Sequence, residues 1–90
     1  ELFEFDKNVN SMDDLRPGMI LDGLVTNITA FGAFVDIGLK NDGLVHISKM
    51  SKERIKSPYE RVAVGDIVTV SVIDIDLDRN KVALSMLESV

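Results

Sequence analysis

Alternating apolar and other residues predict short β-strands along most of the chain. Ala33, Val35 and Ile37 are separated by single residues of other types, which places these three side chains on one face of a strand. The glycine-, asparagine- and aspartate-rich segments between such runs are typical of turns. Further strands are predicted in four segments rich in β-branched and aliphatic residues, namely 19–29, 43–48, 68–72 and 82–86.

A helical pattern separates the third and fourth predicted strands. Residues 57–60 read Ser-Pro-Tyr-Glu, which combines capping-box spacing with proline at the first helical position. A second capping-box spacing at 11–14 predicts one helical turn that ends before Pro17. Three strands, a short helical insert and two strands is the order of an all-β, five-stranded antiparallel OB-fold Greek-key barrel.

The composition indicates one small globular domain. The 90 residues are 46% hydrophobic and 28% charged, and cysteine is absent, which excludes disulfides and thiolate metal sites. No apolar run has the length of a membrane span, and we expect a cytoplasmic setting. Because the chain starts at glutamate, we expect a piece of a longer protein. Its expected parts are an N-terminal extension over 1–16, the barrel over 17–86 and a C-terminal tail over 87–90.

The charge distribution argues against binding to nucleic acid by bulk charge alone. Ten basic and fifteen acidic residues give a net charge of −5. One segment, 39–61, is an exception, with six basic residues against three acidic ones. A block of this kind is most often a solvated face.

Two phenylalanines and the single histidine are the candidate binding residues. Phe34 lies opposite Val35, and His46 lies opposite Val45, so both are predicted on the outer face of the barrel. A bulge or kinked strand entry at Gly32 would turn Phe31 outward as well. Such a surface is a stacking platform for unpaired bases. The alternative is that Phe31 closes one end of the barrel and His46 is an ordinary surface histidine.

Nothing in the sequence indicates catalysis. It contains no glycine-rich phosphate loop and no nucleophile motif. Asp74, Asp76 and Asp78 have the spacing that opens a calcium loop. Arg79 then stands where that loop needs glycine, and Ser85 where it needs glutamate. We therefore expect no enzyme activity, no metal site and no cofactor.

Five segments together resemble the S-one (S1) type of RNA-binding domain. They are GMILDGLV at 18–25, FGAFVDI at 31–37, GLVHIS at 43–48, VGDIV at 64–68 and KVALS at 81–85. With the upstream MDDLRPGM at 12–19, the chain is most similar to the C-terminal domain of the Tex family of bacterial transcription accessory proteins. The resemblance implies an OB barrel that binds single-stranded RNA on its outer sheet face.

The resemblance also implies roles for individual residues. By motif position, the stacking aromatics of the family fall on Phe31 and Phe34, and its platform histidine falls on His46. The acid that closes the fourth strand falls on Asp76.

The basic contacts are less closely matched. The residue that opens the fifth strand falls on Lys81, where the family more often has arginine, which adds a planar stacking surface. Arg79 in the preceding hairpin is an alternative phosphate contact, and Lys49 is a further candidate.

We therefore expect a non-catalytic, single-stranded RNA-binding domain of a larger, Tex-like transcription accessory protein. Single-stranded DNA is a second candidate ligand, because every base offers a π-face. Other domains of the parent chain are expected partners, the domain itself is expected to be monomeric, and no membrane contact is expected. The alternative function is a protein–protein docking module that uses the same face.

Overall fold

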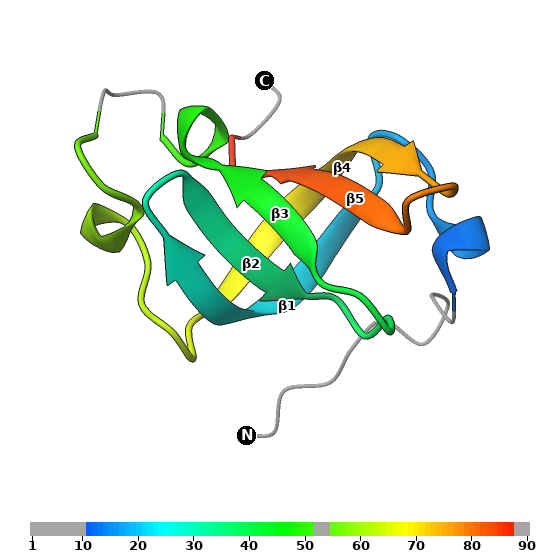
Figure 1. The fold of residues 1–90 in the computed structure, drawn as a ribbon, viewed down its shortest axis with the longest axis horizontal. Helices are drawn as coiled ribbons and strands as arrows, with labels where there is room; N and C mark the ends of the chain where they lie inside the picture. The colour runs from blue at the N-terminus through cyan, green and yellow to red at the C-terminus, as the bar shows by residue number, and fades with distance from the viewer. Residues whose placement is uncertain (1–10, 52–54, 88–90) are drawn as a thin grey trace.

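Five strands form a closed barrel in the computed structural model, which describes residues 11–51 and 55–87 (Figure 1). The strand order around the barrel is β1-β2-β3-β5-β4. This confirms the predicted five-stranded OB-type barrel. The strands are β1 (Ile20–Thr29), β2 (Gly32–Asp36), β3 (Gly43–His46), β4 (Ile67–Asp76) and β5 (Lys81–Ser85).

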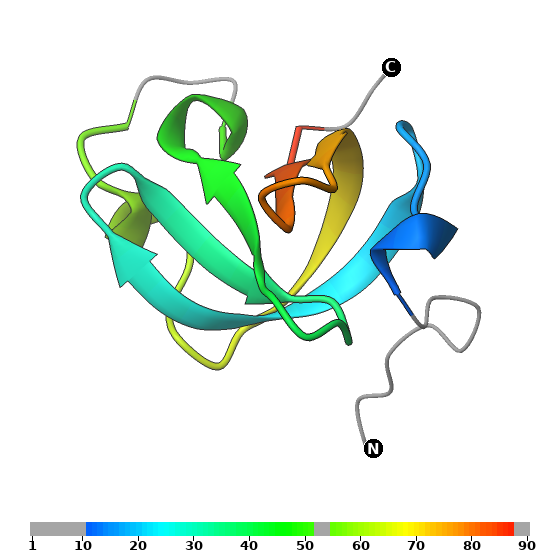
Figure 2. The same cartoon turned by 45° about the vertical axis from the view of Figure 1, so that its right-hand side comes forward.

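Strand β1 is long enough to pair with two neighbours. Its first half pairs with β4, from Ile20 opposite Ser71 to Leu24 opposite Ile67. Its second half pairs with β2, and the register shifts between Val25 and Asn27. Figure 2 shows β1 curving along one side of the barrel between these two partners.

One pairing in the barrel is parallel. Strands β1–β2, β1–β4, β2–β3 and β4–β5 are antiparallel, as the sequence predicts. Strand β3 instead runs parallel to β5, with Leu44 opposite Ala83 and Val45 opposite Leu84. A parallel neighbour requires a long connection, and here the connection includes the helical insert and all of β4.

The helical segments are single 3-10 turns. The two capping boxes predicted at Ser11 and Ser57 precede η1 (Met12–Asp14) and η3 (Pro58–Glu60), respectively. A third turn, η2 (Ile47–Lys49), begins where the sequence predicts that the third strand continues to Ser48. Strand β3 ends at His46 because its side chain accepts a hydrogen bond from the Ser48 amide (3.2 Å) and so caps η2.

Alternation along the strands fills the barrel with aliphatic side chains. Val35, Val45 and Val70 are fully buried, as their positions in the sequence predict. Leu15, which precedes β1, is also 2% exposed and belongs to the same core. The Gly18 amide donates to the Val72 carbonyl at 2.7 Å, so the segment before β1 is held against β4. Burial of each such Val or Leu side chain contributes about 1.5–3 kcal/mol.

Candidate nucleic-acid interface

An open groove of about 730 Å³ lies on the outer face of the barrel. It brings together side chains from β2, β3, β4, β5, η2 and the β1–β2 turn. Five of the seven residues predicted for the binding site line it: Phe31, Phe34, His46, Lys49 and Lys81. The groove therefore collects residues that are far apart in the chain, from Phe31 to Leu84.

An apolar row forms the floor of the groove. Phe34 on β2 lies opposite Leu44 on β3, and Leu44 lies opposite Ala83 on β5. Ile73 extends the row onto β4, next to the register shift that sets Asp74 opposite Ala83. Neighbouring strands are separated by about 4.8 Å, so a row across four strands is about 14 Å long. We call Phe34, Leu44, Ala83 and Ile73 the apolar row.

Phe31 reaches the groove from a turn. It lies in the two-residue connection between β1 and β2 and is 51% exposed. Its carbonyl accepts a hydrogen bond from the Ile47 amide (2.8 Å), and the next residue, Gly32, pairs with His46. Of the two alternatives expected at Gly32, a bulge or a kinked strand entry, the bulge is not formed, because β2 and β3 pair in unbroken register from Gly32 to Val35. The turn, which ends at Phe31, gives this ring its outward position.

His46 has two hydrogen bonds that orient its ring. The Ser48 amide donates to Nδ1 at 3.2 Å, and the Ser48 hydroxyl lies 2.9 Å from the same nitrogen. Nδ1 is therefore the ring nitrogen that accepts the Ser48 amide hydrogen bond. His46 is an exposed side chain that both caps η2 and lines the groove.

Charged side chains lie on both sides of the apolar row. Asp42 and Lys81 stand two positions before the paired residues Leu44 and Ala83, so the parallel register sets both on one side of the row. Lys49 closes η2 beyond His46, on the other side. The Asp42 carboxylate accepts a hydrogen bond from the Thr26 hydroxyl at 2.6 Å. Each side of the groove therefore has one lysine.

The other two predicted residues contact each other instead of the groove. The Arg79 guanidinium lies 3.8 Å from the Asp76 carboxylate, and the Arg79 amide donates to that carboxylate at 3.2 Å. Both interactions stabilise the β4–β5 hairpin. Asp76 pairs across the hairpin with Lys81, so the ion pair lies beside one edge of the groove.

The groove includes residues that the sequence analysis did not single out. Leu44 and Ile73 supply much of the apolar row, and Ala83 contributes the smallest side chain in it. Strand alternation contains a signal for them, because each stands next to an inward-facing residue and so faces outward. Their convergence depends on the pairing of β3 with β5, which no local pattern indicates.

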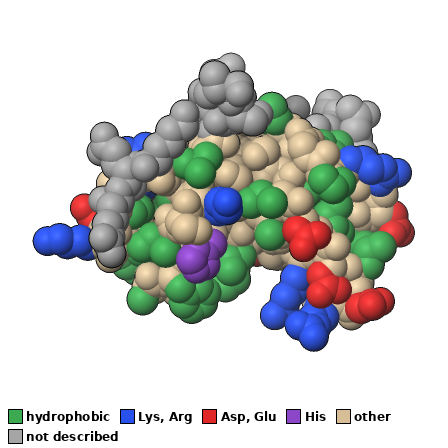
Figure 3. Space-filling view, turned by 90° about the horizontal axis from the view of Figure 1, so that it is seen from above, with side chains coloured by type: hydrophobic (Ala, Val, Ile, Leu, Met, Phe, Trp, Pro, Cys, Tyr) green, Lys and Arg blue, Asp and Glu red, His purple; other side chains and the backbone are tan. Residues whose placement is uncertain are grey.

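The space-filling view places these features on one surface. Figure 3 shows the histidine beside a group of hydrophobic side chains, with a basic side chain close by. Acidic side chains gather toward another part of the same face. Base stacking and phosphate contact are therefore available at one place on an acidic domain.

Two classes of feature are not found among the described residues. Within 11–51 and 55–87, no group of three or more His, Asp or Glu side chains is arranged to hold a metal ion. In the same ranges no helix has the length and apolar character needed to cross a membrane.

Comparison with known proteins places this chain in a family. Residues 14–87 match the family described as "S1 RNA binding domain". The chain is 54% identical over 83 residues to protein YhgF of Escherichia coli and 48% identical over 82 residues to the transcriptional accessory protein Tex of Neisseria gonorrhoeae. These matches cover 92% and 91% of this chain, but only 11% of each relative.

A solved structure supports the same assignment. The solution structure of GSP13 from Bacillus subtilis is 38% identical, with a TM-score of 0.75 over 80% of this chain and 55% of that one. The fold and the sequence match therefore indicate the same family. The chain therefore belongs to the S1 RNA binding domain family, and it is related to Tex-like proteins.

Proposed function

We propose that the domain binds single-stranded RNA by stacking unpaired bases on Phe31, Phe34 and His46. The observation that carries this proposal is the convergence of two phenylalanines, a histidine and two lysines on one groove. Aromatic rings accept any base, because every base has a π-face. The floor between them is apolar, so it contacts the face of a base while the polar edges of that base stay in water.

Stacking is strong enough to compensate for the negative charge of the domain. Each base–aromatic stack contributes about 1–3 kcal/mol, so stacks on Phe31, Phe34 and His46 together correspond to about 3–9 kcal/mol. A dissociation constant of 1 mM corresponds to about 4 kcal/mol, so we expect the isolated domain to bind in the millimolar to micromolar range. Neighbouring domains of a longer chain would raise the affinity through effective concentration.

The lysines complete the proposed site. Lys49 and Lys81 lie on opposite sides of the apolar row, where each reaches the phosphates of a strand laid along the groove. Arg79 is a further phosphate contact in the proposal, held near the groove edge by its ion pair with Asp76. Few phosphates are contacted, so stacking supplies most of the binding energy.

The proposal extends to the setting of the domain. The chain spans 11% of the length of the Tex-like relatives named above. We therefore propose a cytoplasmic, monomeric RNA-binding part of a longer transcription accessory protein, with the catalytic status of the longer protein set by its other domains. Single-stranded DNA is a second ligand in this proposal, because stacking does not require the 2′-hydroxyl.

The test is an NMR titration of the domain with short single-stranded RNA and with DNA of the same sequence. We expect shift changes centred on Phe31, Phe34 and His46, while resonances of Ile67 and Thr69, on the β1–β4 side, stay fixed. The ratio of the two affinities gives the preference for RNA. Absence of shifts at near-millimolar ligand would reject the proposal and favour protein docking at this groove.

A further inference from the structure

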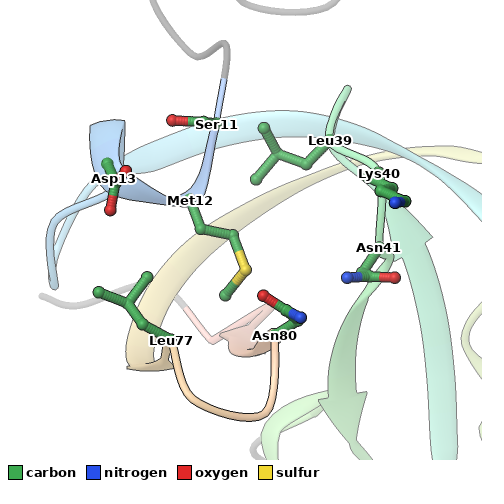
Figure 4. Close-up of a pocket in the computed structure, with 8 residues that line it drawn as sticks. All are labelled: Ser11, Met12, Asp13, Leu39, Lys40, Asn41, Leu77 and Asn80. Atoms are coloured by element: carbon green, nitrogen blue, oxygen red, sulfur yellow. The ribbon is translucent and has the colours of Figure 1, made fainter.

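A second hollow of about 650 Å³ lies at the end of the barrel where η1 meets two loops (Figure 4). This volume falls within the range of ordinary small-ligand sites. Met12 comes from η1, Lys40 and Asn41 from the β2–β3 loop, and Asn80 from the β4–β5 hairpin. Figure 4 shows the side chains of Met12 and Asn80 pointing toward each other in this space.

The hollow and the groove are lined by residues that are adjacent in the chain. Asn41 directly precedes Asp42, and Asn80 directly precedes Lys81. Asp42 and Lys81 line one side of the groove, whereas Asn41 and Asn80 line the hollow. A strand that leaves the apolar row past Asp42 and Lys81 therefore heads toward the residues that line the second hollow.

The two asparagines offer unused hydrogen-bonding groups. Within the described part of the chain, neither side-chain amide has a hydrogen-bond partner. Each amide carries a donor and an acceptor, which is the combination that pairs with a base edge, as asparagine does with adenine. Asn80 has φ 54°, a left-handed conformation that asparagine tolerates, so the hairpin fixes where this amide stands.

The remaining lining suits one nucleotide. Met12, with Leu39 and Leu77, supplies apolar contact for the face of a base. Lys40 supplies a positive charge for its phosphate. The Asp13 carboxylate also lines the hollow and repels phosphate, so the base, and not the sugar–phosphate backbone, must lie against η1.

We propose that this hollow is a second RNA subsite that holds one base beyond the groove. The base contacts Met12 and hydrogen-bonds to the amides of Asn41 and Asn80, while Lys40 contacts the phosphate. The inference rests on the proposed function of the groove, because the groove delivers the strand to the hollow. It assigns a binding role to the segment before β1.

The test compares a trinucleotide with an octanucleotide of adenylate, since only the longer strand reaches both sites. The variant is the double substitution Asn41→Ala with Asn80→Gly, in which glycine keeps the left-handed turn. Lys40→Ala is the second variant, and Lys56→Ala, near η3 at the opposite end of the barrel, is its matched control. Affinities are measured by fluorescence anisotropy, with the fold of each variant checked by NMR.

We expect the double variant to bind the trinucleotide as the parent does and the octanucleotide about tenfold more weakly. Lys40→Ala weakens only the octanucleotide, and Lys56→Ala weakens neither. An unchanged octanucleotide affinity in the double variant overturns the subsite, as does an equal loss for both lengths. The groove is judged separately: if Phe34→Ala leaves trinucleotide binding unchanged, the proposed function fails, and not only the subsite.

Discussion

Gly32 and His46 lie directly opposite each other across β2 and β3, at a spacing that only glycine permits. A Cβ atom on Gly32 would stand 2.3 Å from the Val45 carbonyl oxygen and 3.1 Å from the His46 Cα. Both obstacles are backbone atoms, which cannot rotate away. The position of His46 relative to Phe31 thus depends on the absence of a side chain at Gly32.

Gly32→Ala is therefore expected to lower the free energy of unfolding by about 3 kcal/mol or more, because β2 and β3 must separate. The matched control is Gly65→Ala, at a glycine with φ +97° where an added Cβ would meet no atom within 4 Å, so that only backbone strain of about 1–2 kcal/mol is expected. Urea unfolding measures both values. Equal losses in the two variants would contradict the close-approach argument.

Phe34→Ala is expected to weaken binding of single-stranded RNA about tenfold, because one base stack is lost. Tyr59→Ala is the control, since Tyr59 is 66% exposed but lies in η3, outside the groove. Anisotropy with a labelled oligonucleotide measures the affinities. Phe31→Ala is a second test of the stacking platform. Because the Phe31 ring is 51% exposed, this substitution should change the free energy of unfolding little. Full affinity in both folded phenylalanine variants would reject the stacking platform.

Ile73→Ser is expected to weaken RNA binding about fivefold, through the loss of about 1 kcal/mol of apolar contact at the far end of the apolar row. Ile67→Ser is the control. Ile67 is the same residue type on the same strand and is also exposed, but it lies outside the groove. Both variants should keep the parent stability within about 0.5 kcal/mol, as exposed positions usually do. The same anisotropy assay applies, and equal affinities for the two variants would exclude Ile73 from the site.

Binding should depend only weakly on salt. If Lys49, Lys81 and Arg79 neutralise three phosphates of a strand confined to the groove, the slope of log affinity against log salt concentration is about −2.1. Lys49→Ala or Lys81→Ala should each reduce its magnitude by about 0.7, and Lys56→Ala should not change it. Titrations at several salt concentrations measure the slope. A steep slope that survives both groove substitutions would point to the basic segment 39–61 as the real contact surface.

The local parts of this architecture were predictable, and the reason is physical. Alternation places Val35 and Val45 inside and their neighbours Phe34 and His46 outside, because strand side chains alternate with period two. Likewise, the capping box at Ser57 acts within four residues and appears as predicted. Each of these features depends on a few adjacent residues.

The non-local parts were not predictable in the same way. Ile73 joins the groove only because β5 lies between β3 and β4. Strand β3 ends at His46, before the predicted end at Ser48, and this depends on the His46 side chain, which caps η2. Asp76 carries a motif match and Arg79 is an alternative phosphate contact, yet in the structure the two side chains contact each other. A sequence pattern indicates which side chains face outward, but the pairing of distant strands decides which of them meet.

The parallel pairing of β3 with β5 has a consequence for when the domain becomes functional. The apolar row crosses this seam between Leu44 and Ala83, so its two halves meet only when the last strand has closed the barrel. A chain emerging from the ribosome therefore has no complete groove until β5 is synthesised and in place. If the groove binds an oligonucleotide as proposed, the bound strand spans this seam and stabilises the folded state by mass action.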